Sequence, residues 1–507
     1  MRFREAIGRW KWVIGGLFAV LLVGYIVRSI NLTLLPIFVD EAIYVRWAQI
    51  MSSEPTLRFL PLSDGKQPLY MWILMFLIKY FSDPLFIGRM VSVMTGVGTA
   101  LGVFVFSYIL FKNKSVSLVS LFLYIISPFS VFFDRLALVD SMLSMFCLWT
   151  AILGYLTAKY DRWDLAMLTG FSLGFGLLTK SPAIFIAFLL PTFWLLLNIR
   201  GILKLSATYI IAYLMYNIQR LGPNFDLLSS RTADYVRPIN HIFISFFDPL
   251  IPHLKDFLVW VGSLGPSAII PIFLVGIYFG LKEKLRVTIV LLIWFLAPVF
   301  VQAEYALAFT ARYVYFVIPY LFILAGLAIM INQKVIRFFV LGFIVIFVVQ
   351  SIIFNFYLLT NPEKAQLPRG ERSGYLEEWT AGQGIAEIAS YLKNQSSIIN
   401  NQQIIVGTEG YFGTLPDGLQ IYVNDYPNII VIGVGVIITE TPQSLREAVE
   451  AGNKTYLVVN KSRFRANYED LGYKLISKYP KALRLADSDQ YAKFGPREEL
   501  FFFEITK

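Results

Sequence analysis

Residues 12–44, WVIGGLFAVLLVGYIVRSINLTLLPIFVDEAIY, join an apolar run to two acidic residues, Asp40 and Glu41. The run from Trp12 to Ile30 is long enough to cross a hydrocarbon core of about 30 Å as a helix. Carboxylates at the edge of a bilayer are costly and usually have a function. They also commonly cap the first turn of a helix, so this stretch alone leaves a catalytic and a capping role open.

Similar apolar runs recur as far as residue 358, in a chain of 507 residues that is 57% hydrophobic and 15% charged. They predict a polytopic α-helical membrane protein with about eleven transmembrane helices. The predicted spans are 12–30, 87–111, 115–133, 138–158, 164–179, 181–198, 205–220, 264–281, 286–302, 312–331 and 336–358. A signal peptide would have a shorter apolar core and a small-residue cleavage site, so the first span is expected to be retained.

Every second connection between these spans is short and basic. The residues are Lys112, Lys114, Lys159, Arg162, Arg200, Lys204, Lys282, Lys284, Arg286, Lys334 and Arg337. The positive-inside rule places them, and the basic N-terminus, in the cytoplasm. The long connections 31–86 and 221–263 and the C-terminus then lie outside the plasma membrane. The net charge of +10 is therefore topological and indicates no nucleic-acid partner.

The composition changes near Thr360. Residues 360–507 carry a net charge of −2, which leaves +12 for residues 1–359. Helical spacing occurs at 382–394 and 442–452, and strand-like segments occur at 404–406, 419–423, 429–434, 456–460 and 500–505. We therefore predict a transmembrane domain over 1–359 and an extracytoplasmic α/β domain over 360–507. The apolar segment 71–78 is short for a span and predicts an interfacial or re-entrant helix.

Polar residues collect at the predicted outer ends of the spans. They are Asp40, Glu41, Lys66, Arg135, Asp140, Lys180, Arg312 and Tyr313. Taken singly, such cations usually extend to lipid head groups, and such carboxylates cap helices. Cations on the outer face nevertheless run against the positive-inside bias. Carboxylates and cations facing one apolar cavity suit a substrate with an anionic head and an apolar tail, because cations hold phosphate and a carboxylate can accept a proton.

Cysteine and histidine are scarce. The single cysteine, Cys147, excludes an intramolecular disulfide and lies in an apolar run, where it is expected to pack. His241 and His253 are the only histidines, which argues against a metal site made of histidine alone.

The acidic stretch also carries a resemblance to a family. Asp40-Glu41-Ala42-Ile43-Tyr44 resembles the acidic motif in the first outer loop of protein O-mannosyltransferases and aminoarabinose lipid A transferases. These are multispanning glycosyltransferases of the GT-C class that use polyprenyl-phosphate sugars. Lys66-Gln67-Pro68-Leu69-Tyr70-Met71-Trp72 resembles their Lys-Pro-Pro-x-x-x-Trp stretch, with Gln67 in place of the first proline.

Further motifs follow in the order found in the family. They are Gly88-Arg89-Met90-Val91-Ser92, Arg135-Leu136-Ala137-Leu138-Val139-Asp140, Leu178-Thr179-Lys180-Ser181-Pro182, and Arg312-Tyr313 with Pro319. The resemblance covers about residues 10–330. The tail segment 375–382, Tyr-Leu-Glu-Glu-Trp-Thr-Ala-Gly, is similar to a phrase found in uncharacterised bacterial members.

The resemblance implies inverting transfer of a sugar from a polyprenyl phosphate to a lipid, glycan or protein acceptor. Asp40 would then be the base that activates the acceptor, Glu41 would shape the pocket, and Asp140 would be a second pocket carboxylate. Lys66, Lys180 and Arg312, with Arg135 and Tyr313 nearby, would hold the phosphate of the donor.

The resemblance implies no certain cofactor but leaves a divalent metal open, because some relatives bind one through a Glu beside the lysine. That position is Gly65 here, which leaves His241 or His253 as the candidate ligands. Two other functions remain open. A transporter or flippase for a lipid-linked sugar would use the same cations and an apolar groove, although no internal repeat of the kind common in transporters is present. A receptor would use the tail as a ligand-binding module.

Overall fold

The computed structural model describes residues 2–197, 199–398 and 402–506. The chain forms two compact units. The first, here called the membrane unit, comprises Met1–Leu32, Thr56–Ile73 and Arg89–Pro368. The second, here called the α/β unit, comprises Thr33–Pro55, Leu74–Gly88 and Arg369–Lys507. Asp40 and Glu41 therefore belong to the same compact unit as the tail.

The membrane unit is almost entirely helical. Its helices are α1 (Arg2–Ser29), α4 (Pro84–Phe111), α5 (Lys114–Ile126), α6 (Pro128–Phe133), α7 (Val139–Tyr160), α8 (Trp163–Thr179), α9 (Ala183–Leu189), α10 (Pro191–Leu197), α11 (Leu203–Tyr216), α12 (Leu227–Ser230), α13 (His241–Ile244), α14 (Leu250–Ser263), α15 (Ile269–Glu283), α16 (Leu285–Tyr305), α17 (Ile318–Gly326) and α18 (Lys334–Thr360). The first residues of α4 fall in the α/β unit.

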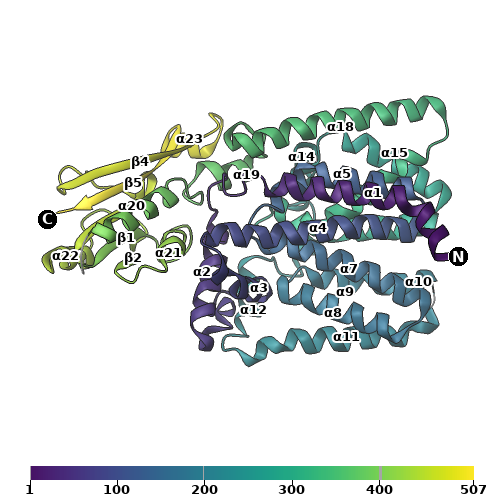
Figure 1. Cartoon of the computed structure of the whole chain (residues 1–507), viewed down its shortest axis with the longest axis horizontal. Coiled ribbons are helices and arrows are strands. Elements are labelled where there is room, and N and C mark those ends of the chain that lie inside the picture. The colour runs from purple at the N-terminus through teal and green to yellow at the C-terminus, as the bar shows by residue number, and fades with distance from the viewer. Residues whose placement is uncertain (1, 198, 399–401, 507) are drawn as a thin grey trace. The chain divides into compact units, whose positions relative to one another are not determined.

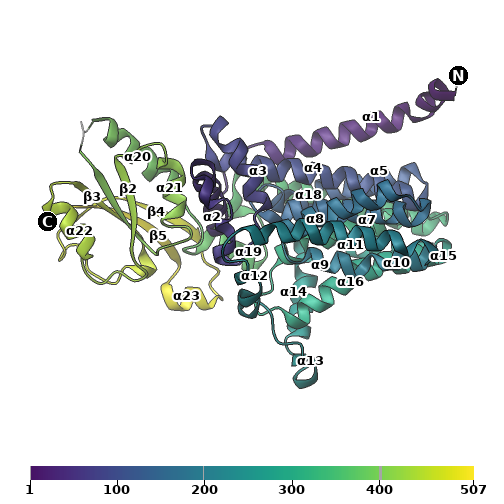
Figure 2. The same ribbon diagram turned by 90° about the horizontal axis from the view of Figure 1, so that it is seen from below.

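Long helices of this unit run alongside one another, as Figures 1 and 2 both show for α4, α7, α8 and α11. Helix α8 packs between α7 and α11, while α17 packs against both α5 and α15. The residues of α17 are all buried. The apolar residues on the outward faces of α1 and α18 are exposed instead, which suits contact with lipid.

Six helical stretches among the described residues are long and apolar enough to cross a membrane. They are Trp10–Ser29, Pro84–Phe111, Val139–Tyr160, Leu285–Tyr305, Ala311–Met330 and Lys334–Thr360. The other predicted spans also coincide with helices, but these are shorter, as in α5, α8, α11 and α15. The total of about eleven spans therefore stays a prediction. Helix α3 (Leu69–Leu77) covers the segment expected to be interfacial, and its nine residues are too few to span a bilayer.

The α/β unit contains one five-stranded sheet with strand order β2-β1-β3-β5-β4. The strands are β1 (Ile404–Glu409), β2 (Ile429–Gly435), β3 (Lys454–Asn460), β4 (Tyr473–Leu483) and β5 (Arg497–Ile505). Strands β2, β1 and β3 are parallel, whereas β5 runs antiparallel to both β3 and β4. Its helices are α2 (Val39–Ser53), α19 (Arg369–Arg372), α20 (Ile385–Ile398), α21 (Asp417–Val423), α22 (Gln443–Glu450) and α23 (Asp489–Phe494).

Both faces of this sheet are covered. Leu445 of α22 packs with Ile405, Leu457 and Phe503 on one face. On the other face the ring of Tyr391, from α20, contacts the rings of Tyr456 and Phe502. Residues of β1 are consequently buried on both sides, which explains why its first three residues, Ile404–Val406, are all apolar.

One prediction for the tail was wrong, and one strand was not predicted. Residues 419–423 were expected to form a strand because Leu, Ile and Val alternate with polar residues, but they form helix α21. This helix buries Leu419, Ile421 and Val423 and packs against α2 and α20, so tertiary contacts overrode the local strand propensity. Strand β4 was missed; it is an edge strand with exposed lysines and so lacks a strong apolar pattern.

Candidate functional site

Asp140 and Lys180 form an ion pair in the membrane unit. Asp140 lies in the first turn of α7, and Lys180 directly follows the last residue of α8, which packs against α7. Lys180 Nζ lies 2.6 Å from Asp140 Oδ1, and only 2% of the Asp140 side chain is exposed. The second oxygen, Oδ2, is buried and has no hydrogen-bond partner among the described residues. The lysine therefore neutralises a carboxylate that still has acceptor capacity.

Two more of the predicted residues lie beside this pair. The ring of Tyr313 has Lys180 Nζ at 4.5 Å and the guanidinium carbon of Arg312 at 5.3 Å from its centroid. These distances are in the range for attraction between a cation and an aromatic face. Because the ring lies within reach of both cations, the structure brings Asp140, Lys180, Arg312 and Tyr313 together. We call these four residues the cation cluster.

Lys66 lies in a loop whose shape depends on Asp64. Lys66 Nζ is 3.3 Å from Asp64 Oδ2, and Arg231 forms an ion pair with the other carboxylate oxygen. Between them, Gly65 adopts a positive φ of 65°, and a Cβ added there would lie 3.0 Å from the carbonyl oxygen of Leu227. A glycine is thus needed at this turn, both for the backbone conformation and for the close approach.

The loop that carries Lys66 is hydrogen-bonded to the loop that carries Lys180. Gln67 Nε2 donates to Ser181 Oγ at 2.7 Å, and each of these residues directly follows one of the two lysines. The family motif has a proline at the position of Gln67. A proline side chain could not donate this hydrogen bond, so the bond depends on the residue in which this chain differs from the motif. It fixes the two lysine-bearing loops relative to each other.

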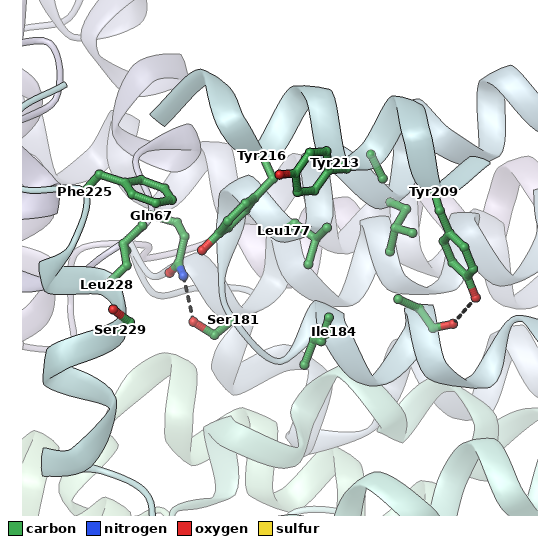
Figure 3. Close-up of a pocket in the computed structure, with 13 residues that line it drawn as sticks. Gln67, Leu177, Ser181, Ile184, Tyr209, Tyr213, Tyr216, Phe225, Leu228 and Ser229 are labelled. Carbon is green, nitrogen blue, oxygen red and sulfur yellow. Dashed lines mark hydrogen bonds between the residues drawn. The ribbon is translucent and has the colours of Figure 1, made fainter. Parts of the chain in front are cut away.

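A groove of about 540 Å³ opens beside this hydrogen bond (Figure 3). Gln67, Ser181 and Ser229 are its polar residues. Its other lining residues are Leu173, Leu177, Ile184, Ala187, Tyr209, Ala212, Tyr213, Tyr216, Phe225 and Leu228. The groove therefore extends from the residues that follow the two lysines, Gln67 and Ser181, along α8, α9 and α11, and most of its lining is apolar or aromatic.

Arg135 does not lie in the cation cluster but holds the end of α1. Its guanidinium donates to the carbonyls of Val27, Arg28, Ile30 and Asn31 at distances of 2.7 to 3.2 Å. Carbonyls in the last turn of a helix have no partner within the helix, so this arginine acts as a C-terminal cap. Its assignment to the donor phosphate stays a prediction, and we leave Arg135 out of the proposed site.

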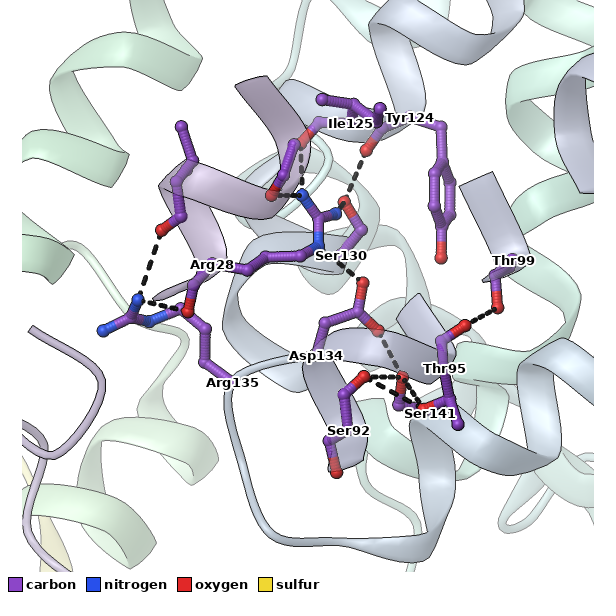
Figure 4. Close-up of polar contacts among 12 residues, drawn as sticks. Arg28, Ser92, Thr95, Thr99, Tyr124, Ile125, Ser130, Asp134, Arg135 and Ser141 are labelled. Carbon is purple, nitrogen blue, oxygen red and sulfur yellow. Dashed lines mark hydrogen bonds and ion pairs between the residues drawn. The ribbon is translucent and has the colours of Figure 1, made fainter. Parts of the chain in front are cut away.

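The aspartate beside Arg135 was missed in the sequence. Asp134 is fully buried and accepts from Arg28 Nε at 2.9 Å and from Ser141 Oγ at 2.6 Å (Figure 4). It also accepts from the Tyr315 hydroxyl at 2.7 Å. The available signal was Arg28 itself, an ionisable residue inside the first apolar run. With all these partners made, the network is suited to holding α1, α6 and α7 together.

Asp40 and Glu41 lie in the first turn of α2, in the α/β unit. The buried carboxylate of Glu41 accepts a hydrogen bond from the backbone N–H of Phe38 at 3.0 Å, which is the reciprocal half of a capping box. The capping role left open by the sequence therefore applies to Glu41. Asp40 is half-buried and precedes it at the same helix N-terminus, where a negative charge is favoured.

The two histidines make separate polar contacts. His241 Nδ1 lies 3.3 Å from Glu304 Oε1, and its Nε2 lies 3.3 Å from a nitrogen of Arg237. His253 Nδ1 lies 2.8 Å from the carbonyl oxygen of Ala303. No group of three or more His, Cys, Asp or Glu side chains suited to a metal occurs among the described residues. A cation next to His241 also opposes metal binding there.

A described protein family matches part of the chain. Residues 65–218 match the sequence profile of the family described as dolichyl-phosphate-mannose-protein mannosyltransferase. This range contains Lys66, Asp140 and Lys180. No curated protein sequence matches the chain.

Solved structures match over a much greater length. ArnT from Cupriavidus metallidurans, in the apo state and bound to undecaprenyl phosphate, is similar with a TM-score of 0.59, 14% sequence identity and 98% of each chain covered. The archaeal oligosaccharyltransferase AglB from Archaeoglobus fulgidus, in complex with an inhibitory peptide and a dolichol-phosphate, has a TM-score of 0.47 and 12% identity over 88% of this chain and 69% of its own. The chain is thus a multi-pass membrane protein with the GT-C fold of ArnT, and it resembles the dolichyl-phosphate-mannose-protein mannosyltransferases over residues 65–218.

Proposed function

We propose that this protein is an inverting glycosyltransferase that moves a sugar from a polyprenyl-phosphate donor to a hydroxyl or amine of a lipid, glycan or protein acceptor. The observation that carries the proposal is the cation cluster. The Gln67–Ser181 hydrogen bond links it to the loop that carries Lys66, and the apolar groove opens beside that bond. That combination fits a substrate with an anionic head and a long apolar tail. It is supported by the ArnT structure that contains undecaprenyl phosphate.

We assign to Asp40, Lys66, Lys180 and Arg312 a single displacement at the anomeric carbon. Asp40 takes the proton from the acceptor as the new bond to the anomeric carbon forms. The bond from that carbon to the phosphate oxygen breaks on the opposite face, and the polyprenyl phosphate leaves as an anion. Lys66, Lys180 and Arg312 stabilise this anion, so no acid is needed at the leaving group.

Within the proposed site, Asp140 and Tyr313 act on Lys180. The carboxylate draws the ammonium group to a fixed position, and the ring provides a face against which both cations can lie. A phosphate bound there would meet two cations that are already ordered. Pre-ordering of this kind lowers the free-energy cost of binding.

The experiment that tests the function is transfer from a polyprenyl-phosphate sugar by purified wild-type protein and by Asp40→Asn. A general base contributes about 10²- to 10⁴-fold, so Asp40→Asn should lose transfer by that factor while donor binding is retained. A flippase would instead move the donor lipid across vesicles in both proteins and transfer nothing. Wild-type turnover by Asp40→Asn would remove Asp40 from the mechanism.

We also propose that the N-terminus is cytoplasmic and that a domain beginning near residue 360 is extracytoplasmic in the plasma membrane. Cysteine labelling in intact cells can test this, because the natural Cys147 is buried. An impermeant reagent should label Ala451→Cys and should not label Lys112→Cys. The reverse pattern would overturn both the topology and the position of the site.

A further inference from the structure

The chain segment just before Asp40 is paired with the tail. The backbone N–H of Val39 donates to the carbonyl of Thr380 at 3.0 Å, and the N–H of Gly382 donates to the carbonyl of Ile37 at 2.8 Å. These two hydrogen bonds flank an antiparallel bridge between Phe38 and Ala381. All of these residues belong to the α/β unit. The backbone that enters α2, and thus the direction of its first turn, is therefore set by residues 380–382.

Lys481 holds the same tail segment from β4. Its Nζ donates to the carbonyl of Ala381 at 2.6 Å and to the carbonyl of Glu378 at 3.0 Å, and the residue is 1% exposed. The register of β4 against β5 shifts between Pro480 and Leu483, so Lys481 lies at an irregularity of the strand. Irregularities of this kind redirect a side chain out of the regular pleat.

Burying an ammonium group in a protein interior is energetically unfavourable. Removing the charge from water costs several kcal/mol unless acceptors and counter-charges compensate, and a methionine would pack the same volume without that cost. Arg484, which directly follows β4, forms ion pairs with Glu378, at 2.7 and 3.0 Å, and with Glu498, at 2.9 Å. Two buried cations, Lys481 in β4 and Arg484 directly after it, therefore hold residues 378–381 in position.

The paired strand segments also approach unusually closely. A Cβ added to Gly382 would lie 2.4 Å from Ile37 Cγ2 and 2.9 Å from the carbonyl oxygen of Ile37. Any other residue at position 382 would push the segment that leads into Asp40 away from the tail. Phe38 adds a ring contact to Tyr375, with 4.2 Å between centroids, on the same segment.

From these contacts we infer that Lys481 is a positioning residue for the base Asp40, acting through residues 378–382 and their pairing with Ile37–Val39. This inference rests on the proposed function, in which Asp40 accepts the proton of the acceptor. Displacement of a catalytic group by about 1 Å can cost about 10²-fold in rate, so the position of the first turn of α2 matters directly.

The primary test is Lys481→Met in the full-length protein, with transfer kinetics at varied donor and acceptor. We expect kcat to fall about 10- to 100-fold while the acceptor KM and the donor affinity stay within about twofold. The decisive comparison is the double variant Lys481→Met/Asp40→Asn. If Lys481 acts through Asp40, it should change the residual turnover of Asp40→Asn by less than about twofold, because the base is already absent.

Two results would overturn the inference. One is wild-type kcat in Lys481→Met, and the other is the same 10- to 100-fold loss in the presence and absence of the Asp40 carboxylate. Failure of the proposed function gives a different result, because the wild-type protein would then transfer no sugar. Loss of only the Asp40 assignment would appear as wild-type transfer by Asp40→Asn alone.

A second variant decides the matter if Lys481→Met does not fold. Gly382→Ala leaves Lys481 intact but separates the paired segments, so it should lower kcat without changing donor affinity. Gly370→Ala is the matched control, since a Cβ at this exposed position would meet no atom within 4 Å. Equal and normal turnover in both glycine variants would refute the positioning role.

Discussion

Lys180 Nζ lies 2.6 Å from Asp140 Oδ1, so two residues that are 40 positions apart in the sequence share one charge-assisted hydrogen bond at the ends of α8 and α7. The carboxylate is almost fully buried, whereas the lysine side chain is 20% exposed. The lysine is therefore the member of the pair that a ligand can reach, and the aspartate is the member that orients it.

Breaking this pair should separate stability from catalysis. Lys180→Met leaves a buried carboxylate without a counter-charge, which typically costs about 3–5 kcal/mol. We expect a lower Tm in detergent and loss of transfer. In Lys180→Met/Asp140→Leu the Tm should return towards the wild-type value while transfer stays absent. Normal transfer by the double variant would exclude Lys180 from phosphate binding.

Tyr313 should act through its ring rather than its hydroxyl. Tyr313→Phe keeps the face that lies 4.5 Å from Lys180 Nζ, whereas Tyr313→Leu removes it. A cation–π contact contributes about 0.5–2 kcal/mol, so the leucine variant should raise the donor KM by roughly 2- to 30-fold. The phenylalanine variant should resemble the wild type. Equal KM values for the two variants would contradict this role.

Lys66 should affect the donor more than the acceptor. Lys66→Ala removes a point charge from the loop held by Asp64 and should raise the donor KM, while Lys66→Arg should retain part of the activity. The matched control is Lys255→Ala, which removes an exposed lysine from the connection 221–263. If Lys66→Ala leaves the dependence on donor unchanged, Lys180 and Arg312 become the residues to test for phosphate binding.

If the lipid of the donor lies in the apolar groove, the donor KM should depend on the length of that lipid. Ala187→Phe places a larger side chain in the groove beside Tyr209 and Ile184. Each buried methylene contributes about 0.8 kcal/mol, so loss of two such contacts would raise the KM of a long-chain donor roughly tenfold. A donor too short to enter the groove is the internal control, and its KM should not change. An equal effect on both donors would show that the tail binds elsewhere.

The stability of the α/β unit should depend on pH through Lys481. Burial lowers the pKa of this lysine to about 8, below its ordinary value of about 10.4. The unfolded chain therefore binds more protons than the native chain between about pH 8 and 10.4, and the contribution of Lys481 to stability rises with pH across that window. The Tm of the wild type, relative to Lys481→Met, should accordingly rise from pH 8 to 10. If the difference in Tm between the wild type and Lys481→Met does not change with pH, the amine of Lys481 is in contact with water.

The residues that bear the proposed chemistry could be identified from the sequence, but their partners could not. Lys180 and Asp140 stood out because charge at the outer end of an apolar run is unusual. Nothing in the local sequence indicates that Gln67 bonds to Ser181, or that Arg135 caps α1. Such contacts join residues more than 100 positions apart and depend on which helices pack together.

The sequence by itself determined the long apolar helices of the membrane unit and most strands of the tail, because apolar length and alternation reflect a local requirement of lipid or sheet. Tertiary structure decided three further matters. It turned 419–423 into a helix buried against its neighbours. It made Glu41 a cap. It also joined residues 33–55 to the tail in one compact unit, through backbone pairing that leaves no trace in side-chain pattern. Local propensity amounts to tenths of a kcal/mol per residue, so packing and long-range hydrogen bonds prevail wherever the two compete.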